Sequence, residues 1–558
     1  MPPTGDAEPL VETPDDYGAF PRLSDEQIKL LSRHGERRAT RPGDILFREG
    51  DVSTDFFVVL SGMVAVVEGY GTPDERVIRI HGPRRFLGEL SLLTGEASFL
   101  TTVVREPGEV LVVPLAGLRQ VVAQDADLGD LILRAYFLRR SLLIGLGVGL
   151  RIIGSRYSPD THRLREFCAR NRIPHRWIDL ERDPGAEALL RQMTIAPEDT
   201  PVVIWKGRSV LRNPSNAELA LVIGLRPPAT PGAGCDLLVV GAGPAGLAAA
   251  VYGASEGLDV MVVDAVATGG QAGTSSRIEN YLGFPAGISG AELAERGVIQ
   301  AEKFGARFSV PARATGLEPE NGHYVVHFDD DTAITTRTVL IASGVRYRKL
   351  PLARLEEFEG TSVYYAATQM EAHLCMGDPV VVVGGGNSAG QACLFLARHA
   401  AGVTLVVRHD DLGRDMSRYL VDGIERDPNI TVLLQSEVVE LAGNDGMLSG
   451  VVIEDRRTGE RRPHDARALF VFIGTEPHVE WLCDQIALDE GGYIMTGPDA
   501  ATAAAGHYHD GDQPLFLETS RPGVFAAGDI RSGSIKRVAS AVGEGSMAVR
   551  LIHDRLDG

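Results

Sequence analysis

Cysteine is scarce in this sequence. Five cysteines occur among 558 residues, and no two of them form a CxxC pair. So few scattered thiols cannot build the disulfide framework of a small secreted domain, and they are typical of a protein in a reducing compartment. We therefore expect a cytoplasmic protein without structural disulfides.

Positive charge and long apolar runs are also lacking. The 55 basic residues stand against 75 acidic ones, a formal net charge of −20, which would repel a polyanion. The apolar stretch from Leu142 to Leu150 lies between two arginines and is far shorter than the roughly 20 residues of a membrane helix. The acidic, Pro-rich N-terminus does not resemble a secretory signal. We expect neither nucleic acid nor a membrane as a partner.

The length requires several domains. At roughly 150 residues per domain, the chain would form about three or four units. In residues 1–145, short β-rich runs at roughly ten-residue spacing predict a small antiparallel roll, followed by a helix over 118–144. Strand and helix signals alternate in residues 146–225 and predict a small α/β unit. Residues 226–234 are rich in Pro and Gly and predict a linker.

Two later stretches each combine a buried strand, a Gly-rich turn, a helix and a second buried strand, the βαβ unit of a parallel sheet. In the first, the turn reads GAGPAG. Its glycines permit a tight turn and a close approach of the backbone to a pyrophosphate, and the acid that ends the second strand can bind a ribose hydroxyl. The candidate residues are Gly241, Gly243, Pro244, Ala245, Gly246 and Asp264.

The second stretch predicts an NADPH site. Its turn supplies Gly384, Gly386, Asn387, Ser388 and Ala389. No acid ends its second strand, which leads instead into Arg408 and His409. Because these side chains can bind a 2′-phosphate that a carboxylate would repel, NADPH is favoured over NADH.

From Cys235 onward the chain resembles the low-molecular-weight thioredoxin reductases, through GAGPAG, GGQAGTSSRIENYLGFPAGISGAEL, IASG, GGGNSA, IGTEP and GVFAAGDI in the family's order. The resemblance implies a FAD domain in two parts, 235–350 and 475–558, around an NADPH domain, 351–474. Homodimerisation is usual in that family. It also implies that FAD contacts Gly270, Gln271, Asn280, Gly344, Gly528, Asp529, Arg537, Val538 and Ala539.

The resemblance fails at the redox dithiol. The family carries CATC after a tyrosine, and the matching stretch here is Tyr365-Ala-Ala-Thr-Gln369. Ala366 and Gln369 therefore occupy the positions of the two cysteines. Thiol–disulfide exchange requires a thiolate that attacks a disulfide sulfur, which neither residue provides. Cys375 stands alone and is predicted to be a packing residue.

Residues 146–225 resemble the glutaredoxin/thioredoxin fold. The resemblance rests on GSRYSPDTHRL and on Thr200-Pro201 before a buried strand, and it implies a cis proline at Pro201. The fold's dithiol position reads Ser158-Pro-Asp-Thr161. We therefore expect a domain without a redox pair, in which Cys168 belongs to the core.

The N-terminal roll resembles cyclic-nucleotide-binding domains, through GDILFREGD, FFVVLSG and FLGELSLLTG. The resemblance implies ligand contacts from Gly88, Glu89, Leu90 and Ser91. The arginine that clamps the cyclic phosphate in that family falls near Ser98, and a serine replaces its charge-assisted contact with at best a neutral hydrogen bond. A cyclic nucleotide, another ligand and a role in packing between domains all stay open.

These features predict a multidomain protein: a β-roll with helices, a small α/β thioredoxin-like domain, and two Rossmann-like three-layer domains. We expect a FAD-dependent NADPH oxidoreductase that passes electrons from the flavin to a non-dithiol acceptor, such as a quinone, oxygen, or a ferredoxin- or flavodoxin-type protein. One alternative is a thioredoxin-disulfide reductase under cyclic-nucleotide control. Another is a redox or nucleotide sensor with little turnover. No metal site is expected.

Overall fold

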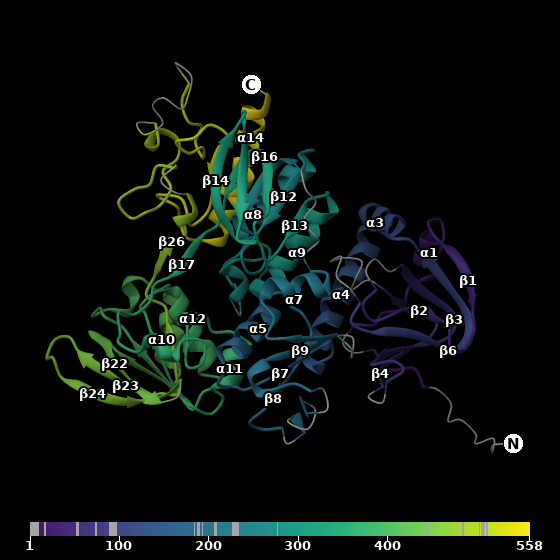
Figure 1. The fold of residues 1–558 in the computed structure, drawn as a ribbon, viewed down its shortest axis with the longest axis horizontal. Helices are drawn as coiled ribbons and strands as arrows, with labels where there is room; N and C mark the ends of the chain where they lie inside the picture. Colours follow the sequence, from purple (N-terminus) through teal and green to yellow (C-terminus); the bar gives the residue numbers. More distant parts are fainter. Residues whose placement is uncertain are drawn as a thin grey trace. The chain divides into compact units, whose positions relative to one another are not determined.

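A computed structural model gives the fold (Figure 1). The chain divides into two units, Met1–Gly154 with Arg172–Pro228, and Ser155–Asn171 with Ala229–Gly558. The structure describes residues 11–15, 18–51, 55–72, 75–88, 98–183, 185–186, 190–191, 194–205, 209–225, 234–275, 277–444, 446–482, 485–501, 503, 508 and 512–557.

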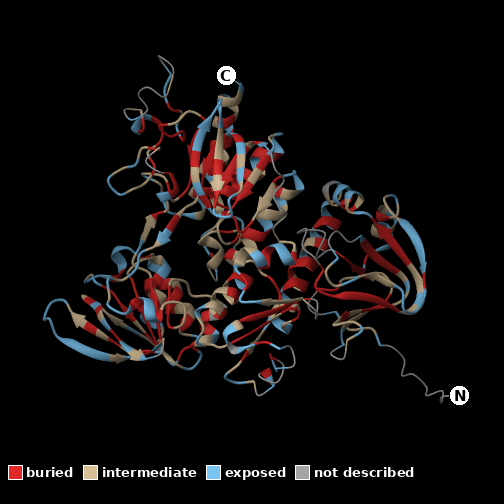
Figure 2. Ribbon diagram, viewed as in Figure 1, coloured by how far each residue is buried: buried red, intermediate tan, exposed pale blue. Residues whose placement is uncertain are grey.

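The first unit begins with an antiparallel sheet. Its order is β1-β6-β3-β4, with β2 paired to β6 and β5 paired to β3. The two long strands, β3 and β6, are rich in valine, which suits a pleated, half-buried surface, and Figure 2 shows buried residues along them. The strands are β1 (Glu36–Thr40), β2 (Ile45–Phe47), β3 (Phe56–Glu68), β4 (Arg76–His81), β5 (Phe86–Leu87) and β6 (Thr101–Val113). The predicted roll is thus present as a sheet of six strands.

Helix α1 (Asp25–Leu31) precedes this sheet, and α3 (Leu115–Gln124) and α4 (Ala126–Leu146) follow it. The sequence predicted one helix over 118–144, and this was wrong at Asp125. Its backbone is extended, with φ −120° and ψ 103°, and its carboxylate accepts a hydrogen bond from the Leu128 amide. An aspartate in this position is an N-cap. The apolar period continues across it, so the periodicity alone did not reveal the break.

A second, four-stranded sheet in the first unit has the order β10-β9-β7-β8. Strands β7 and β8 are parallel, whereas β9 is antiparallel to both β7 and β10. The Thr200–Pro201 peptide before β9 is cis, which confirms that expectation. The elements are β7 (Leu150–Gly154), β8 (His175–Asp179), η1 (Pro197–Asp199), β9 (Val202–Trp205), β10 (Ser209–Arg212) and α7 (Asn216–Ile223).

The second unit contains a seven-stranded sheet of order β13-β12-β11-β16-β15-β14, with β27 paired to β16. The pairs β11–β12, β11–β16, β12–β13 and β16–β27 are parallel. The elements that form or flank it are β11 (Gly234–Val240), α8 (Pro244–Ser255), β12 (Val260–Val263), η2 (Ala272–Thr274), α9 (Gly290–Lys303), β13 (Arg307–Ser309), β14 (Ala314–Glu320), β15 (His323–Phe328), β16 (Ala333–Ile341), η4 (Glu480–Leu482), η5 (Gly497–Asp499), β27 (Val524–Ala526) and α14 (Val538–Asp557).

A five-stranded parallel sheet of order β18-β25-β19-β20-β21 and a three-stranded antiparallel sheet, β22-β23-β24, follow in the same unit. Their elements are α10 (Leu355–Phe358), β18 (Val363–Tyr364), α11 (Gln369–Leu374), β19 (Pro379–Val383), α12 (Asn387–Leu396), β20 (Gly402–Val406), η3 (Leu412–Arg414), α13 (Arg418–Arg426), β21 (Ile430–Leu433), β22 (Ser436–Asn444), β23 (Met447–Asp455), β24 (Arg461–Asp465) and β25 (Ala468–Val471). Strand β17 (Val345–Tyr347) precedes these two sheets in the chain, and strand β26 (Thr475–Pro477) follows them. The two strands pair antiparallel. Helix α5 (Pro159–Arg170) also belongs to this unit.

Helices α8 and α14 pack closely because both carry small residues. The core around them contains Ala245, Ala249 and Ala548. At Gly545 in α14, an added Cβ would lie 2.1 Å from the Ala245 carbonyl oxygen. Glycine is therefore required where these helices approach each other, and this contact fixes the N-terminal end of α8.

Replacing Gly545 by alanine should lower the free energy of unfolding by about 1–3 kcal/mol, because backbone atoms must move to admit the methyl group. The matched control is Gly543→Ala in the same helix, where an added Cβ has no atom within 4 Å. The control should be neutral or stabilising by roughly 0.5–1 kcal/mol. Denaturant unfolding measures both variants, and equal stability of the two would contradict this packing.

Candidate dinucleotide sites

The first Gly-rich turn follows β11 and requires glycine at two of its positions. Gly241 has φ +112°, and an added Cβ there would lie 2.2 Å from the Ala342 carbonyl oxygen. At Gly246, an added Cβ would lie 1.9 Å from the carbonyl oxygen of Gly241 itself. The strand can therefore turn sharply into α8 while its neighbour stays paired beside it.

The N-terminus of α8 is open above this turn. Gly243 is the N-cap, Pro244 starts the helix, and no side chain among the described residues caps it. The atom nearest to a Cβ built on Gly243 is the Cα of Gly270, 3.9 Å away. Free backbone N–H groups and the positive end of a helix dipole favour an anionic ligand here.

Asp264 shapes the same loop from the end of β12. One carboxylate oxygen accepts from the Ala242 amide at 2.9 Å. The other accepts from the Val266 amide at 2.9 Å and the Ala267 amide at 3.1 Å. The carboxylate thus holds the Gly-rich turn and the next segment together. Each carboxylate oxygen has two lone pairs, so the oxygen bonded to Ala242 can accept one more hydrogen bond. That a ribose hydroxyl donates this bond stays a prediction.

One further predicted residue, Gly270, lies at this turn, and Gln271 follows it. Gly270 lies beside Gly243, and the side-chain amide of Gln271 donates to the Val345 carbonyl oxygen. Gly344 has φ +66°, and a Cβ built on it would have no atom within 4 Å. Asn280 is exposed, and no described contact joins it to the others.

Gly528 lies against the start of α8, and Asp529 follows it in the chain. A Cβ on Gly528 would lie 3.1 Å from the Ala245 side chain, and burial raises the pKa of Asp529 above its usual value. The predicted residues Arg537, Val538 and Ala539 lie at the start of α14, which begins at Val538.

Sequence reasoning missed Glu544 at this place. Its carboxylate accepts from the Gly528 amide at 2.7 Å and forms a salt bridge of 2.5 Å with Arg531, both side chains being 14% exposed. Breaking such a poorly exposed pair by removing one partner is costly. A lone acid between the two glycines of α14 was the signal that could have identified it.

The second Gly-rich turn repeats this construction after β19. Gly384 has φ +146°, and an added Cβ would lie 2.3 Å from the Phe472 carbonyl oxygen. Gly386 is the N-cap of α12, again without a side-chain cap among the described residues, and the nearest atom to its built Cβ is 4.0 Å away. Asn387 accepts from the Ser417 amide at 2.7 Å through its side-chain oxygen. Ser388 and Ala389 fall in the first turn of the helix.

A group of cationic side chains gathers beyond β20. Arg408 donates from Nε to His409 Nε2 at 3.2 Å, and Arg414 Nη1 lies 3.2 Å from His409 Nδ1. The imidazole thus lies between two guanidinium groups. The sequence predicted Arg408 and His409 for a 2′-phosphate and missed Arg414, which the turn of η3 brings back to them. Two guanidinium groups held beside each other in this way suit a phosphate monoester.

The stretch that begins at Tyr365, which the sequence aligned with the family's dithiol, is held by hydrogen bonds. The Thr368 amide and hydroxyl both donate to the Glu371 carboxylate, and the Tyr365 hydroxyl donates to Glu359 at 2.5 Å. Glu371 is 5% exposed, and its burial raises the pKa of the carboxyl group. Ala366 is half-buried beside this network. The segment is therefore organised by polar contacts rather than by a disulfide.

The four cysteines that the structure describes are Cys168, Cys235, Cys375 and Cys393, and each is free and buried. Burial raises the thiol pKa to about 11 at Cys235 and to about 12 at Cys375, and it also raises the pKa of Cys168 and Cys393. Cys168 is 0% and Cys375 is 3% exposed, so the prediction that both are packing residues is confirmed. Since the thiolate is the reactive form, these thiols are inert near neutral pH.

In the roll, Gly88 has φ +97°, and an added Cβ would lie 2.4 Å from the Asp55 carbonyl oxygen. Ser98 is 8% exposed, and its hydroxyl donates to the Leu100 carbonyl oxygen at 2.9 Å. The predicted ligand contacts Glu89, Leu90 and Ser91 lie outside the described residues.

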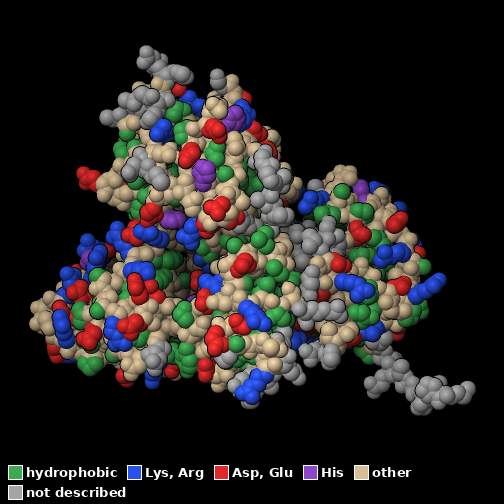
Figure 3. All heavy atoms as spheres, in the orientation of Figure 1, with side chains coloured by type: hydrophobic (Ala, Val, Ile, Leu, Met, Phe, Trp, Pro, Cys, Tyr) green, Lys and Arg blue, Asp and Glu red, His purple; other side chains and the backbone are tan. Residues whose placement is uncertain are grey.

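Over the part of the chain that the structure covers, acidic and basic side chains are interspersed on the face shown in Figure 3. No cluster of three or more potential metal ligands occurs among the described residues. None of the described helices is both long enough and apolar enough to cross a membrane.

Two family models match the chain. The pyridine nucleotide-disulphide oxidoreductase model matches residues 235–545, and the cyclic nucleotide-binding domain model matches residues 37–125. The first match contains both Gly-rich turns, and the second contains most of the antiparallel sheet.

The similar proteins align with the same C-terminal part. The "34.2 kDa protein in rubredoxin operon" of Clostridium pasteurianum is 30% identical over 323 residues, 58% of this chain and 97% of its own length. A thioredoxin reductase of Streptomyces clavuligerus is 32% identical over 314 residues, 56% of this chain and 91% of its own. The crystal structure of Lactococcus lactis thioredoxin reductase in its FR conformation matches with a TM-score of 0.52 and 27% identity, covering 58% of this chain and 99% of that one.

Replacing Arg414 by methionine should raise KM for NADPH about tenfold or more, because a charge-assisted contact to the 2′-phosphate is worth roughly 1.5–3 kcal/mol. KM for NADH, which lacks this phosphate, should change little. Arg418→Met is the matched control, since its side chain is 77% exposed and pairs with Asp422. Steady-state kinetics with both nucleotides measures the effect, and an equal loss for NADPH and NADH would argue against this assignment.

Proposed function

The chain belongs to the pyridine nucleotide-disulphide oxidoreductase family, and from this premise we propose that it oxidises NADPH through FAD and delivers the electrons to an acceptor that is not a dithiol of its own. The observation that supports this proposal most directly is that the described cysteines form no disulfide and are shielded from solvent. The four described cysteines are buried, unpaired and raised in pKa.

The residues of both Gly-rich turns fit the two dinucleotides. At each turn a glycine N-cap leaves a helix N-terminus open, where a side chain at Gly243 or Gly386 would project toward the ligand. Backbone N–H groups of α8 would hold the FAD pyrophosphate, and those of α12 the NADPH pyrophosphate. Arg408, His409 and Arg414 would bind the 2′-phosphate. When bound, the flavin supplies hydride acceptance from NADPH and electron donation to the final acceptor.

The position of the family's dithiol supports an acceptor outside the chain. Ala366 and Gln369 carry no sulfur, and the nearest thiol in sequence, Cys375, donates to the Glu371 carbonyl oxygen at 3.1 Å. A quinone, oxygen, or a ferredoxin- or flavodoxin-type protein could each take electrons from a flavin directly.

The other sequence predictions complete this proposal. We assign residues 1–145 to a cyclic-nucleotide-binding-like domain and 146–225 to a thioredoxin-like domain without a redox pair. FAD would bind 235–350 with 475–558, and NADPH would bind 351–474. The strand order of the small sheet and its cis proline support the second assignment. A cytoplasmic homodimer is the expected form.

Thioredoxin-disulfide reduction under control of the N-terminal domain is the alternative, and the names of several relatives favour it. FAD-loaded protein with NADPH distinguishes the two functions. We expect turnover with 1,4-benzoquinone or ferricyanide, and little with thioredoxin or an aromatic disulfide. Faster turnover with the disulfides would establish the alternative.

Treatment with iodoacetamide near pH 8 should leave the NADPH–quinone rate within about twofold of its starting value. At a thiol pKa of about 12, as for Cys375, roughly one thiol in ten thousand is ionised at that pH. A thioredoxin reductase that has a CxxC pair, reduced and treated in parallel, serves as the positive control for alkylation. Loss of the quinone rate together with labelling of a cysteine would show that a thiol takes part.

A further inference from the structure

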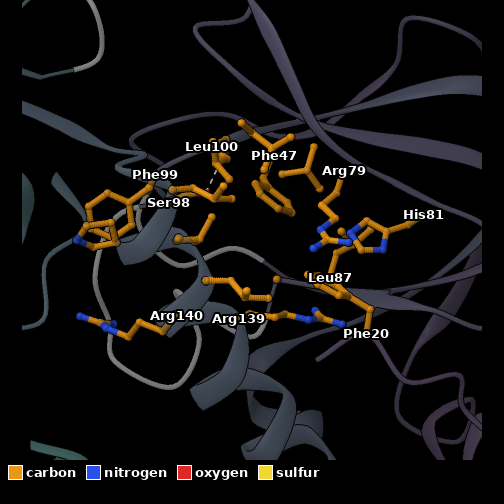
Figure 4. A pocket seen from close by; sticks show the side chains of 17 residues that line it. Phe20, Phe47, Arg79, His81, Leu87, Ser98, Phe99, Leu100, Arg139 and Arg140 are labelled. Atoms are coloured by element: carbon orange, nitrogen blue, oxygen red, sulfur yellow. Dashed lines mark hydrogen bonds between the residues drawn. The ribbon is translucent and has the colours of Figure 1, made fainter. Parts of the chain in front are cut away.

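A cavity in the first unit has a mainly apolar lining among the described residues, which include Gly88 and Ser98 (Figure 4). The predicted ligand contacts Glu89, Leu90 and Ser91 lie outside the described residues, so no ligand is assigned to this cavity. The second unit contains a more informative feature, helix α5.

Helix α5 lies outside residues 235–545, which match the oxidoreductase family model, yet it belongs to the same compact unit as they do. Its 12 residues give it a length of roughly 18 Å at a rise of about 1.5 Å per residue. The helix is therefore an addition to the dinucleotide-binding part of the chain, and its two ends can contact different segments of that part.

The first turn of α5 packs against the proposed NADPH-binding part. The rings of His162 and Tyr364 lie 5.8 Å apart between centroids, and a Cβ built on Gly360 would lie 3.6 Å from Cδ2 of His162. The His162 side chain is 12% exposed, and burial lowers its pKa to about 4, so the imidazole is neutral near pH 7. Ring packing thus holds this end of the helix beside the strand that precedes Tyr365.

Two further side chains extend this contact along the helix. His162, Glu166 and Arg170 recur every four residues and so share one face. Burial raises the pKa of Glu371 in α11, and the nearby charge of Glu166 adds to this rise. Burial also raises the pKa of Tyr347 in β17, and the nearby charge of Arg170 opposes this rise. The face therefore runs from the NADPH-binding part to strand β17.

Strand β17 is one of the two strands through which the chain enters and leaves the NADPH-binding part. It pairs with β26 as a two-stranded sheet. Such a ribbon is only marginally stable by itself. The Tyr347 ring stacks on that of Tyr365, with centroids 6.2 Å apart and planes at 15°. The connection thus needs contacts with its surroundings to keep one arrangement.

The other end of α5 contacts the proposed FAD-binding part. Asn171 is the C-cap of the helix, and its Nδ2 donates to the Val266 carbonyl oxygen at 3.1 Å. The Val266 amide in turn donates to Asp264, the residue that ties this loop to the first Gly-rich turn. The end of α5 is therefore attached to the loop beside the FAD turn.

We propose that α5 clamps the FAD-binding part and the NADPH-binding part together in one relative orientation, through His162 at one end and Asn171 at the other. A chain that passes electrons directly from its flavin to an acceptor needs only the arrangement in which nicotinamide meets flavin. The inference rests on the proposed function for the identity of the two parts, and the contacts of α5 stand without it.

The distance between two spin labels measures the orientation without any turnover. Tyr252→Cys in the FAD-binding part and Tyr419→Cys in the NADPH-binding part are suitable label sites, because their side chains are 46% and 43% exposed. The chain without these substitutions, labelled in parallel, controls for its natural cysteines. We expect a single narrow distance that NADPH leaves unchanged. A broad distribution, or a distance that changes with NADPH, would overturn the proposal.

Two variants in the labelled chain release the ends of α5. His162→Ala removes the ring contact, and Asn171→Leu removes the hydrogen bond to Val266. Each should add a second distance, because the released part can adopt other orientations. Ala169→Ser is the control, since Ala169 is an exposed residue of the same helix, and it should keep the single distance. Distributions that are the same in all three variants would contradict the clamp.

A disulfide tests the same contact if the released variants do not fold. His162→Cys together with Gly360→Cys should form a disulfide on oxidation, and neither substitution alone should. NADPH should then reduce FAD at a rate within about twofold of that of the unoxidised variant, measured by stopped flow. Failure of the disulfide to form, or a rate about tenfold or more lower once it forms, would overturn the proposal. If the natural chain does not reduce FAD with NADPH, the proposed function fails, and the spin-label distances decide the clamp.

Discussion

At both Gly-rich turns, a backbone carbonyl oxygen lies where the Cβ of any residue other than glycine would be. The fold of the C-terminal unit depends on these close backbone contacts. The oxygens of Ala342 and Phe472 lie against Gly241 and Gly384, and that of Ala245 lies against Gly545. Each contact brings two segments closer than a Cβ would allow. As a result the helices begin directly at the carboxyl ends of their strands, with their N–H groups facing the ligand positions.

The second constraint is chemical and concerns the thiols. A cysteine exchanges electrons as a thiolate, and burial in apolar surroundings disfavours that form. The described cysteines are free and buried, and no two of the five cysteines in the sequence form a CxxC pair. The C-terminal unit therefore combines two dinucleotide turns with no reactive thiol among its described residues. This combination motivates a direct transfer from flavin to acceptor.

Much of this could be predicted from sequence because the glycines, the acid after β12 and the cations after β20 are local signals. Four findings could not. Asp125 ends one helix and starts another although the apolar period continues through it. Arg414 reaches Arg408 and His409 only through the turn of η3, and Glu544 reaches Gly528 from the helix that follows it, 16 residues further along the chain. Asp264 holds its own loop by three hydrogen bonds, a role that spacing alone does not suggest.

The central claim is that electrons from NADPH leave through the flavin without passing through a redox-active disulfide. An anaerobic reductive titration of the FAD-loaded protein measures this directly, because the flavin and a thiol pair are each a two-electron couple. The account predicts that full reduction consumes two electrons per bound FAD. Uptake of four electrons per FAD would reveal a redox-active disulfide and contradict it.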